Sequence, residues 1–262
     1  MKQHVPISFA VGLLLASAAF AFQPLITDDT GTQGSGGNQL EFSVNEDRAS
    51  LAGDTTKTRT LQGAYTRGVS DTLDAYFAAS LVRIRSTIPG ADADGSGNPA
   101  LGVKWRFFES EESQTSFALK PEVRLPISSA KETAGLGTGR TSYGLTLILS
   151  QEVPFGAVHA NLATGRNRFS DKVANPDDAT TTRASIAPVW DVSEKWKLAL
   201  DVGRETEVSG GNKTRSDFAE IGTIFSPNKD IDVALGIIRR SDSVNPSTTT
   251  NSVTAGVTWR FK

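Results

Sequence analysis

Charged side chains recur at every second position of several short stretches of this sequence, and they are the residues best placed to do chemistry. Lys104 and Arg106 alternate with the apolar Val103, Trp105 and Phe107. Successive side chains of a β-strand point to opposite faces, so such charges gather on one face. The residues selected on this pattern as lining one common interior are Lys104, Arg106, Lys120, Glu122, Arg124, His159, Asp201 and Arg260.

Two interpretations of this charged face stay open. The charges can form a salt-bridged filling that packs a medium-sized barrel. Alternatively they form a selectivity ring, in which basic groups favour anions and opposed carboxylates set up a transverse field. Lys104, Arg106, Lys120 and Arg124 give the fourth and fifth expected strands a basic excess. We therefore expect any pore to prefer anions mildly, aromatic carboxylates included.

An enzyme is the first rival to a channel. His159 is the sole histidine after the leader, and Asn161 lies on the same face. A His-Ser-Asn set could run a hydrolase, because His accepts a serine proton and Asn orients the ring. No motif marks a serine, so we expect no enzyme activity. The absence of cysteine excludes disulfides and Cys-based metal sites, and we expect neither a metal nor a cofactor.

About twelve stretches of strand length, running from Gln39 to Phe261, must position these side chains. The connections after even-numbered stretches are tight, whereas those after odd-numbered ones are predicted to be long and polar, as in Ile88 to Gly97 and Ile127 to Thr141. This alternation is typical of an outer-membrane barrel, whose periplasmic turns are short and whose outer loops are long. An open sheet edge in hydrocarbon is costly, so the first and last strands must pair.

A secreted β-sandwich also alternates apolar and polar residues, and it remains the alternative fold. The loop pattern, the strand length of about ten residues and the terminal aromatic residues favour the barrel. The aromatic residues expected in a membrane-interface girdle at the tight-turn end are Trp105, Phe107, Trp190, Trp196, Trp259 and Phe261. A net charge of -2 argues against a nucleic-acid partner.

The first residues indicate export. Lys2 and His4 precede an apolar run from Val11 to Phe20, and the small residues around Ala21 suit a signal peptidase. We predict cleavage after Ala21, so residues 1–21 are a signal peptide, 22–38 a polar N-terminal segment and 39–262 the barrel. The expected location is the outer membrane of a Gram-negative cell.

The segment from Gln23 to Gly34, QPLITDDTGTQG, followed by Asn38 to Glu41, resembles the start of mature proteins in the outer-membrane family labelled "MetA-pathway of phenol degradation", often described as transporters. The resemblance continues through the hairpin pattern to the C-terminus. It implies an outer-membrane barrel associated with the breakdown of aromatic compounds. Lys262 is a departure, because such barrels usually finish on the aromatic residue itself. We expect Phe261 to serve as the assembly signal instead.

The N-terminal segment is too polar to face lipid. It is either a disordered periplasmic lead or a plug folded into the lumen, with Asp28 and Asp29 available to pair with basic lumen residues. The sequence thus predicts an all-β, antiparallel transmembrane barrel of about twelve strands. Its expected function is a porin-like channel or transporter for small solutes. A structural or adhesive barrel without an open pore is the second rival. The expected partners are outer-membrane lipid, the barrel-assembly machinery through the last strand, and a small-molecule solute.

Overall fold

The computed structural model describes residues 24–173, 175–244 and 247–262, and almost all of its regular structure is antiparallel sheet. The predicted cleavage site after Ala21 lies outside these residues. The elements are β1 (Asn38–Leu51), β2 (Asp54–Gly68), β3 (Leu73–Ser86), β4 (Ala93–Ser96), β5 (Ala100–Ser110), β6 (Thr115–Arg124), α1 (Ser129–Thr133), β7 (Ser142–Val153), β8 (Gly156–Asn167), β9 (Ala179–Ser193), β10 (Trp196–Ser209), β11 (Asn212–Asn228), β12 (Ile231–Asp242) and β13 (Thr249–Phe261).

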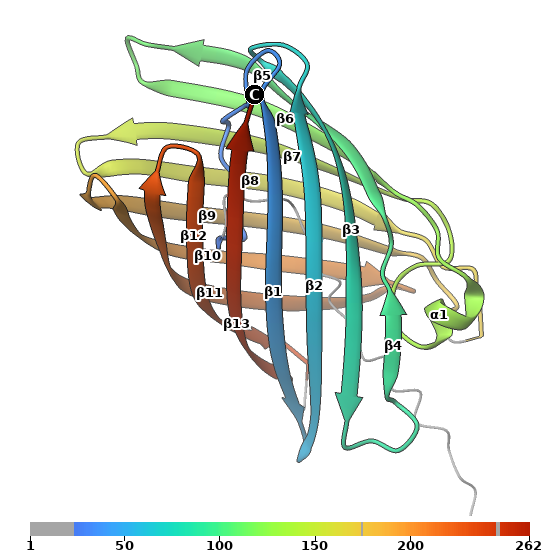
Figure 1. Ribbon diagram of the computed structural model, residues 1–262. Coiled ribbons are helices and arrows are strands. Elements are labelled where there is room, and N and C mark those ends of the chain that lie inside the picture. The colour runs from blue at the N-terminus through green and yellow to red at the C-terminus, as the bar shows by residue number, and fades with distance from the viewer. Residues whose placement is uncertain (1–23, 174, 245–246) are drawn as a thin grey trace, which may run out of the picture.

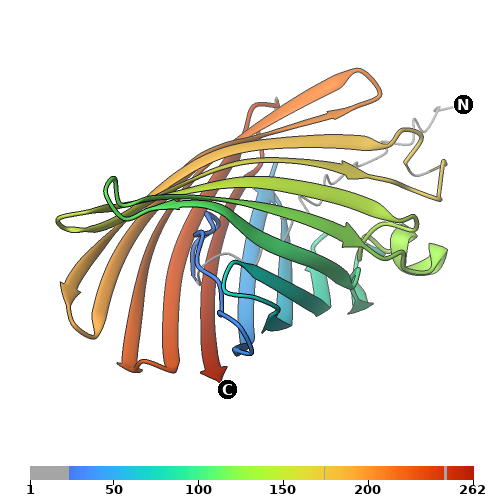
Figure 2. The same cartoon turned by 90° about the horizontal axis from the view of Figure 1, so that it is seen from above.

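The sheet closes on itself, which confirms the predicted barrel of about twelve strands. All 13 strands belong to one sheet, in which β4 is an extra strand paired to the outer part of β3. β1 pairs with β2 on one side and with β13 on the other, in a register that runs from Asn38 opposite Phe261 to Ser50 opposite Thr249. The first and last strands therefore pair as expected, and they satisfy each other's backbone groups. Figures 1 and 2 show the closed wall from the side and from above.

The two ends of the barrel differ in their connections. Tight turns join β2 to β3, β5 to β6, β7 to β8, β9 to β10 and β11 to β12. The C-terminus lies at this tight-turn end, whereas α1, between β6 and β7, lies at the opposite, loop end (Figure 1). No helix in the described part of the chain is long and apolar enough to cross a membrane.

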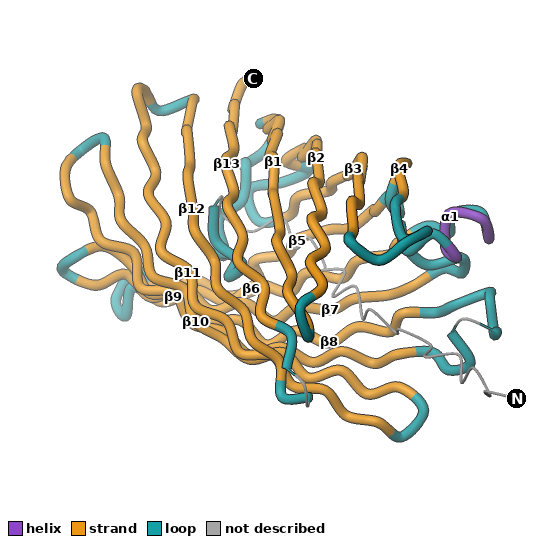
Figure 3. Tube along the Cα trace, turned by 90° about the horizontal axis from the view of Figure 1, so that it is seen from below, coloured by secondary structure: helices purple, strands orange, loops and turns teal. Residues whose placement is uncertain are grey.

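The prediction of long connections at the loop end is wrong for two hairpins. β1 turns into β2 through Ala52 and Gly53 alone, and β10 turns into β11 through Gly210 and Gly211 (Figure 3). All four residues have positive φ, as two-residue hairpin turns with two left-handed residues require. The ends of these strands carry polar residues on both faces. The alternation of apolar and polar residues is weak there, so the sequence indicated a loop and not a strand.

β4 is a third difference at the loop end, because it lies inside the predicted loop from Ile88 to Gly97. Arg83 donates to Asp94 at 2.7 Å, and Arg85 donates to the same carboxylate at 2.6 Å. These bonds hold β4 against the outer part of β3. The acidic, glycine-containing stretch was too polar to predict a strand.

Large apolar side chains cover the outside of the wall. Phe42 is 60% exposed, Ile221 69% and Trp105 51%, which suits lipid contact and not a soluble sandwich with a dry core. The predicted girdle residues face outward, and several form ring pairs, such as Trp259 with Phe261 at 4.7 Å between centroids. Apolar clusters inside the barrel are small and rich in alanine.

Candidate functional site in the barrel interior

The N-terminal segment, residues 24–37, lies inside the barrel and crosses its bore (Figure 2). Leu25 is buried against residues of β9 and β10, namely Ala187, Val189 and Ala199. At the other end of the segment, Gly36 N–H donates to Gly68 O of β2 at 3.0 Å. Of the two interpretations of this segment, the structure shows the lumenal one.

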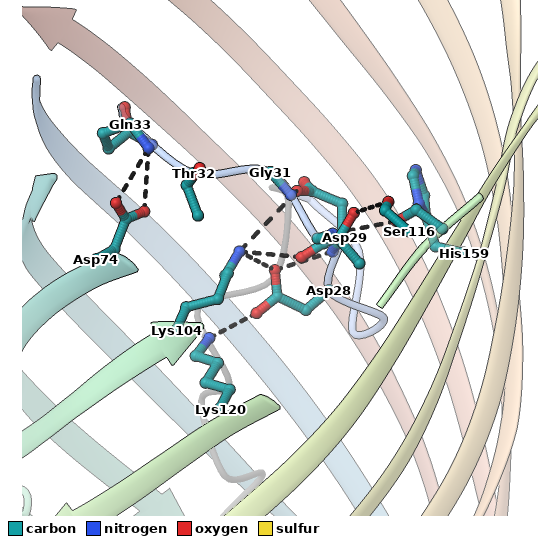
Figure 4. Close-up of polar contacts among 12 residues, drawn as sticks. Asp28, Asp29, Gly31, Thr32, Gln33, Asp74, Lys104, Ser116, Lys120 and His159 are labelled. Carbon is teal, nitrogen blue, oxygen red and sulfur yellow. Dashed lines mark hydrogen bonds and ion pairs between the residues drawn. The ribbon is translucent and has the colours of Figure 1, made fainter. Parts of the chain in front are cut away.

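Asp28 is the electrostatic centre of the segment. Lys104 Nζ of β5 donates to its carboxylate at 2.9 Å and Lys120 Nζ of β6 at 2.6 Å (Figure 4). The Asp28 and Lys120 side chains are nearly inaccessible to solvent, and Lys104 is mostly buried. Burial alone would raise the pKa of Asp28, but the two ammonium groups hold that pKa below its ordinary value of 3.8. The carboxylate is therefore ionised at neutral pH.

Hydrogen bonds to the wall fix the segment on both sides of Asp28. Thr27 N–H donates to Asp201 of β10 at 2.6 Å, and the Thr27 hydroxyl donates to the same carboxylate at 2.8 Å. Thr30 N–H donates to Ser150 Oγ of β7 at 3.1 Å. Gln33 N–H donates to both carboxylate oxygens of Asp74 in β3, each at 3.1 Å.

Asn161 of β8 adds a further anchor. With its amide oriented to suit its neighbours, the Asn161 oxygen accepts from Asp28 N–H at 2.7 Å and its nitrogen donates to Asp28 O at 3.0 Å. Both the side chain and the backbone of Asp28 are thus held by the wall.

A second layer of charges fills the bore on the loop side of Asp28. Tyr76 OH donates to Glu122 at 3.0 Å, and Arg124 lies 3.6 Å from the same carboxylate. Arg183 of β9 pairs with Glu205 of β10 at 3.9 Å. The cavity beside this layer holds only about 30 Å³, room for about one water molecule. The bore is narrow here.

The tight-turn end holds a much larger space, which we call the vestibule. Its volume is about 950 Å³, and it is lined by the N-terminal segment together with polar wall residues such as Glu41, Lys197 and Arg260. Asp28, Lys104, Lys120 and Tyr76 also line the vestibule. A small solute would fit in the vestibule but would meet the segment before reaching the loop end.

All eight residues that the sequence placed on the wet face point inward, but they do not form one ring. Lys104, Lys120 and Asp201 bind the segment, and Glu122 with Arg124 belongs to the second layer. Other members have separate partners: Arg106 lies 3.3 Å from Glu109, His159 Nδ1 2.8 Å from Ser150 Oγ, and Arg260 2.7 Å from Asp232. Asp29 lies 3.9 Å from Lys104.

Acidic residues accompany the basic residues that were expected in excess on the fourth and fifth strands. Asp28 compensates Lys104 and Lys120, and other strands carry buried carboxyl groups that were not among the predicted lumen residues. These overlooked lumen carboxylates are Glu41, Asp74, Glu205, Glu220 and Asp232. Each of these residues lies at one of the alternate strand positions whose side chains face the lumen. In β11, for example, Glu220 is buried and its neighbour Ile221 is exposed on the outer face. Extending the alternation of inward and outward residues along each strand would have predicted these carboxylates.

The comparisons with known proteins agree with this architecture. A family model described as "Putative MetA-pathway of phenol degradation" matches residues 22–261. The COG4313 outer membrane channel from Pseudomonas putida F1 is similar in structure, with a TM-score of 0.69, 12% identity and coverage of 89% of this chain and 98% of that chain. The β-domain of the Bordetella autotransporter BrkA is also similar in structure, with a TM-score of 0.52 and 13% identity. The match covers 87% of this chain and 100% of that chain. These likenesses show the fold. No curated protein matches the sequence.

Proposed function

The chain belongs to the family of the MetA pathway of phenol degradation, and from this premise we propose that it is an outer-membrane channel for small solutes, narrowed by its own N-terminal segment. The observation that carries the proposal is the vestibule of about 950 Å³, which is enclosed by a lipid-compatible wall and lined by polar groups. Tight turns and both ends of the barrel chain face the periplasm in such barrels, so the vestibule opens to the periplasm.

Single-channel recording in planar bilayers tests this function. The purified, processed protein should give a small, steady conductance, because the segment and the second layer leave a narrow polar route. A properly inserted barrel that passes no current would contradict the proposal and would favour a structural or adhesive role.

The solute class follows from the second layer. We propose that it favours small anions. Arg124 and Arg183 are buried there. The Arg124 Nε lies 3.6 Å from Glu122, whereas the Arg183 Nε lacks a hydrogen-bond partner among the described residues. A guanidinium group with a free N–H suits a carboxylate, which it can bind through two parallel hydrogen bonds.

Reversal potentials in a salt gradient test the solute class. Wild type should prefer chloride over potassium, and Arg183→Gln should weaken that preference. Arg204→Gln is the matched control, because Arg204 lies on the outer face and pairs with Asp217 at 2.6 Å. Cation selectivity in wild type, or equal shifts in the two variants, would refute the anion preference and leave the channel itself standing.

A hydrolase is the second candidate, and one contact favours it. Ser150 Oγ lies 2.8 Å from His159 Nδ1, a nucleophile-to-base distance. The third member is engaged elsewhere, because Asn161 binds the backbone of Asp28. His159→Ala should therefore leave ester hydrolysis at background and change only conductance. Esterase activity in wild type that is lost in this variant would establish the enzyme.

A further inference from the structure

A line of mainly basic side chains crosses the outer face of the wall near its loop end. Arg239 of β12 lies opposite Asn251 of β13 in the strand register, and Asn251 lies opposite Arg48 of β1. Arg48 lies opposite Lys57 of β2, which in turn lies opposite Arg85 of β3. These strands are neighbours in the wall (Figure 1). Because adjacent strands are about 4.8 Å apart, the line is roughly 20 Å long.

Arg48, Lys57 and Arg239 point away from the lumen, and we call these three residues the basic row. All three are exposed, and they share the outward face with large apolar side chains. Ile237, two residues before Arg239, is 66% exposed, and Leu61, four residues after Lys57, is 50% exposed. Both apolar residues lie on the tight-turn side of the basic row. The basic row therefore borders the outward apolar surface on its loop side.

The described part of the chain supplies no ion-pair partner for the basic row. None of its three side chains makes an ion pair or a hydrogen bond with a described residue. The outward carboxylate of Glu46, two residues from Arg48, is already paired with Arg59 at 2.5 Å. Like charges directly opposite each other in a sheet are destabilising, and Arg48 faces Lys57 in this way. An anion bound between these two side chains would remove the repulsion.

Other outward arginines near the loop end have carboxylate partners. Arg204 of β10 donates to both carboxylate oxygens of Asp217, at 2.6 and 2.9 Å. Arg166 of β8 lies 3.8 Å from the carboxylate of Asp178. Arg85, at the end of the line, also has such a partner on β4. The basic row differs from these arginines in leaving its charges open to a ligand.

We propose that the basic row binds the phosphate group of a phosphorylated glycolipid in the outer leaflet of the membrane. The loop end of such a barrel faces the outside of the cell, and basic clusters beside an apolar surface recognise anionic lipid headgroups. The guanidinium groups of Arg48 and Arg239 suit phosphate because each can donate two parallel hydrogen bonds. The acyl chains of the same lipid would lie against Ile237 and Leu61. This site does not depend on what the barrel transports.

Binding of bis-phosphorylated lipid A, with fully dephosphorylated lipid A as the comparison, tests the proposal. The protein is refolded in a neutral detergent so that it carries no native lipid, and native mass spectrometry measures the Kd of each lipid. Wild type should bind the phosphorylated lipid at least about tenfold more tightly, because the basic row contacts only the phosphate. Equal affinity for the two lipids would overturn the proposal. This comparison needs no variant, so it holds even if a variant fails to fold.

Two double variants locate the site on the wall. Arg48→Gln combined with Lys57→Gln should weaken binding of the phosphorylated lipid at least about tenfold and leave binding of the dephosphorylated lipid unchanged. Arg204→Gln combined with Arg166→Gln is the matched control, because it removes the same charge from the same face and should bind as wild type does. Equal losses in the two double variants would overturn the proposal. Displacement of the lipid by inorganic phosphate at a similar concentration would overturn it as well, since the site would then bind the free ion.

Discussion

Asp28 links three separated parts of the chain, because one carboxylate compensates Lys104 and Lys120 from adjacent strands. Both lysines are largely buried, so each depends on this partner. Removing one member of a buried ion pair costs about 3–5 kcal/mol, since the remaining charge is left uncompensated. The docking of the N-terminal segment therefore depends mainly on this residue.

Asp28→Asn should release the segment. Because the chain has no cysteine, Thr30→Cys gives a unique thiol at a buried position of the segment, and its maleimide labelling rate reports release. Adding Asp28→Asn to Thr30→Cys should speed labelling at least about tenfold. Asp29→Asn is the matched control, since Asp29 is partly exposed and lies 3.9 Å from Lys104. Equal rates in the two double variants would count against the role of Asp28.

Acid should weaken this contact only at low pH. The paired pKa of Asp28 lies below its ordinary value of 3.8, so its stabilisation is fully present above 3.8 and is lost as the pH falls through the lower paired value. Maleimide labelling slows in acid because the reagent attacks the thiolate, so the ratio of the two rates is compared at each pH. The ratio between the Thr30→Cys proteins with and without Asp28→Asn should stay constant from about pH 7 to 5. A ratio that falls to one by pH 5 would show that Asp28 is not held in its ionised form.

At the level of strands, the outward face decides the environment of the molecule. Trp105, Trp190, Trp196 and Trp259 all face outward, and they are the four tryptophans of the chain. Brominated phospholipids should therefore quench most of the intrinsic fluorescence of the reconstituted protein. The Trp105→Phe and Trp196→Phe variants should each lose a quenchable fraction. Fluorescence that brominated lipid leaves intact would place these side chains in a protein core.

Alternation predicted the strands only where one face meets lipid and the other meets water. Val103 to Phe107 in β5 shows this period, and its inward residues are those that the sequence selected. The outer part of β1, near Arg48, and that of β10, near Glu207, are polar on both faces, so their two-residue turns could not be predicted. The sequence also could not predict which charged residues form pairs. Asp28 meets Lys120, 92 positions away, because of the stagger of the barrel strands and the path of the N-terminal segment.

At the scale of the whole molecule, closure of the barrel wall and filling of its interior depend on different parts of the chain. The pairing of β1 with β13 removes the open edge that lipid would not tolerate. The interior is then filled by a segment that precedes β1, not by wall side chains alone. From the sequence, this segment could be either a disordered periplasmic segment ahead of the barrel or a plug in the lumen, because its composition suits both. Only the positions of Asp201, Asn161 and the two lysines around the bore decide between them.

The most direct test of the channel account is the conductance of a processed chain that lacks residues 24–33. The barrel closes through β1 and β13 without these residues, so the shortened protein should insert. Its single-channel conductance should exceed that of wild type, because only the second layer would then narrow the bore. Equal conductance in the two proteins would contradict the account, since the segment would then not limit the bore.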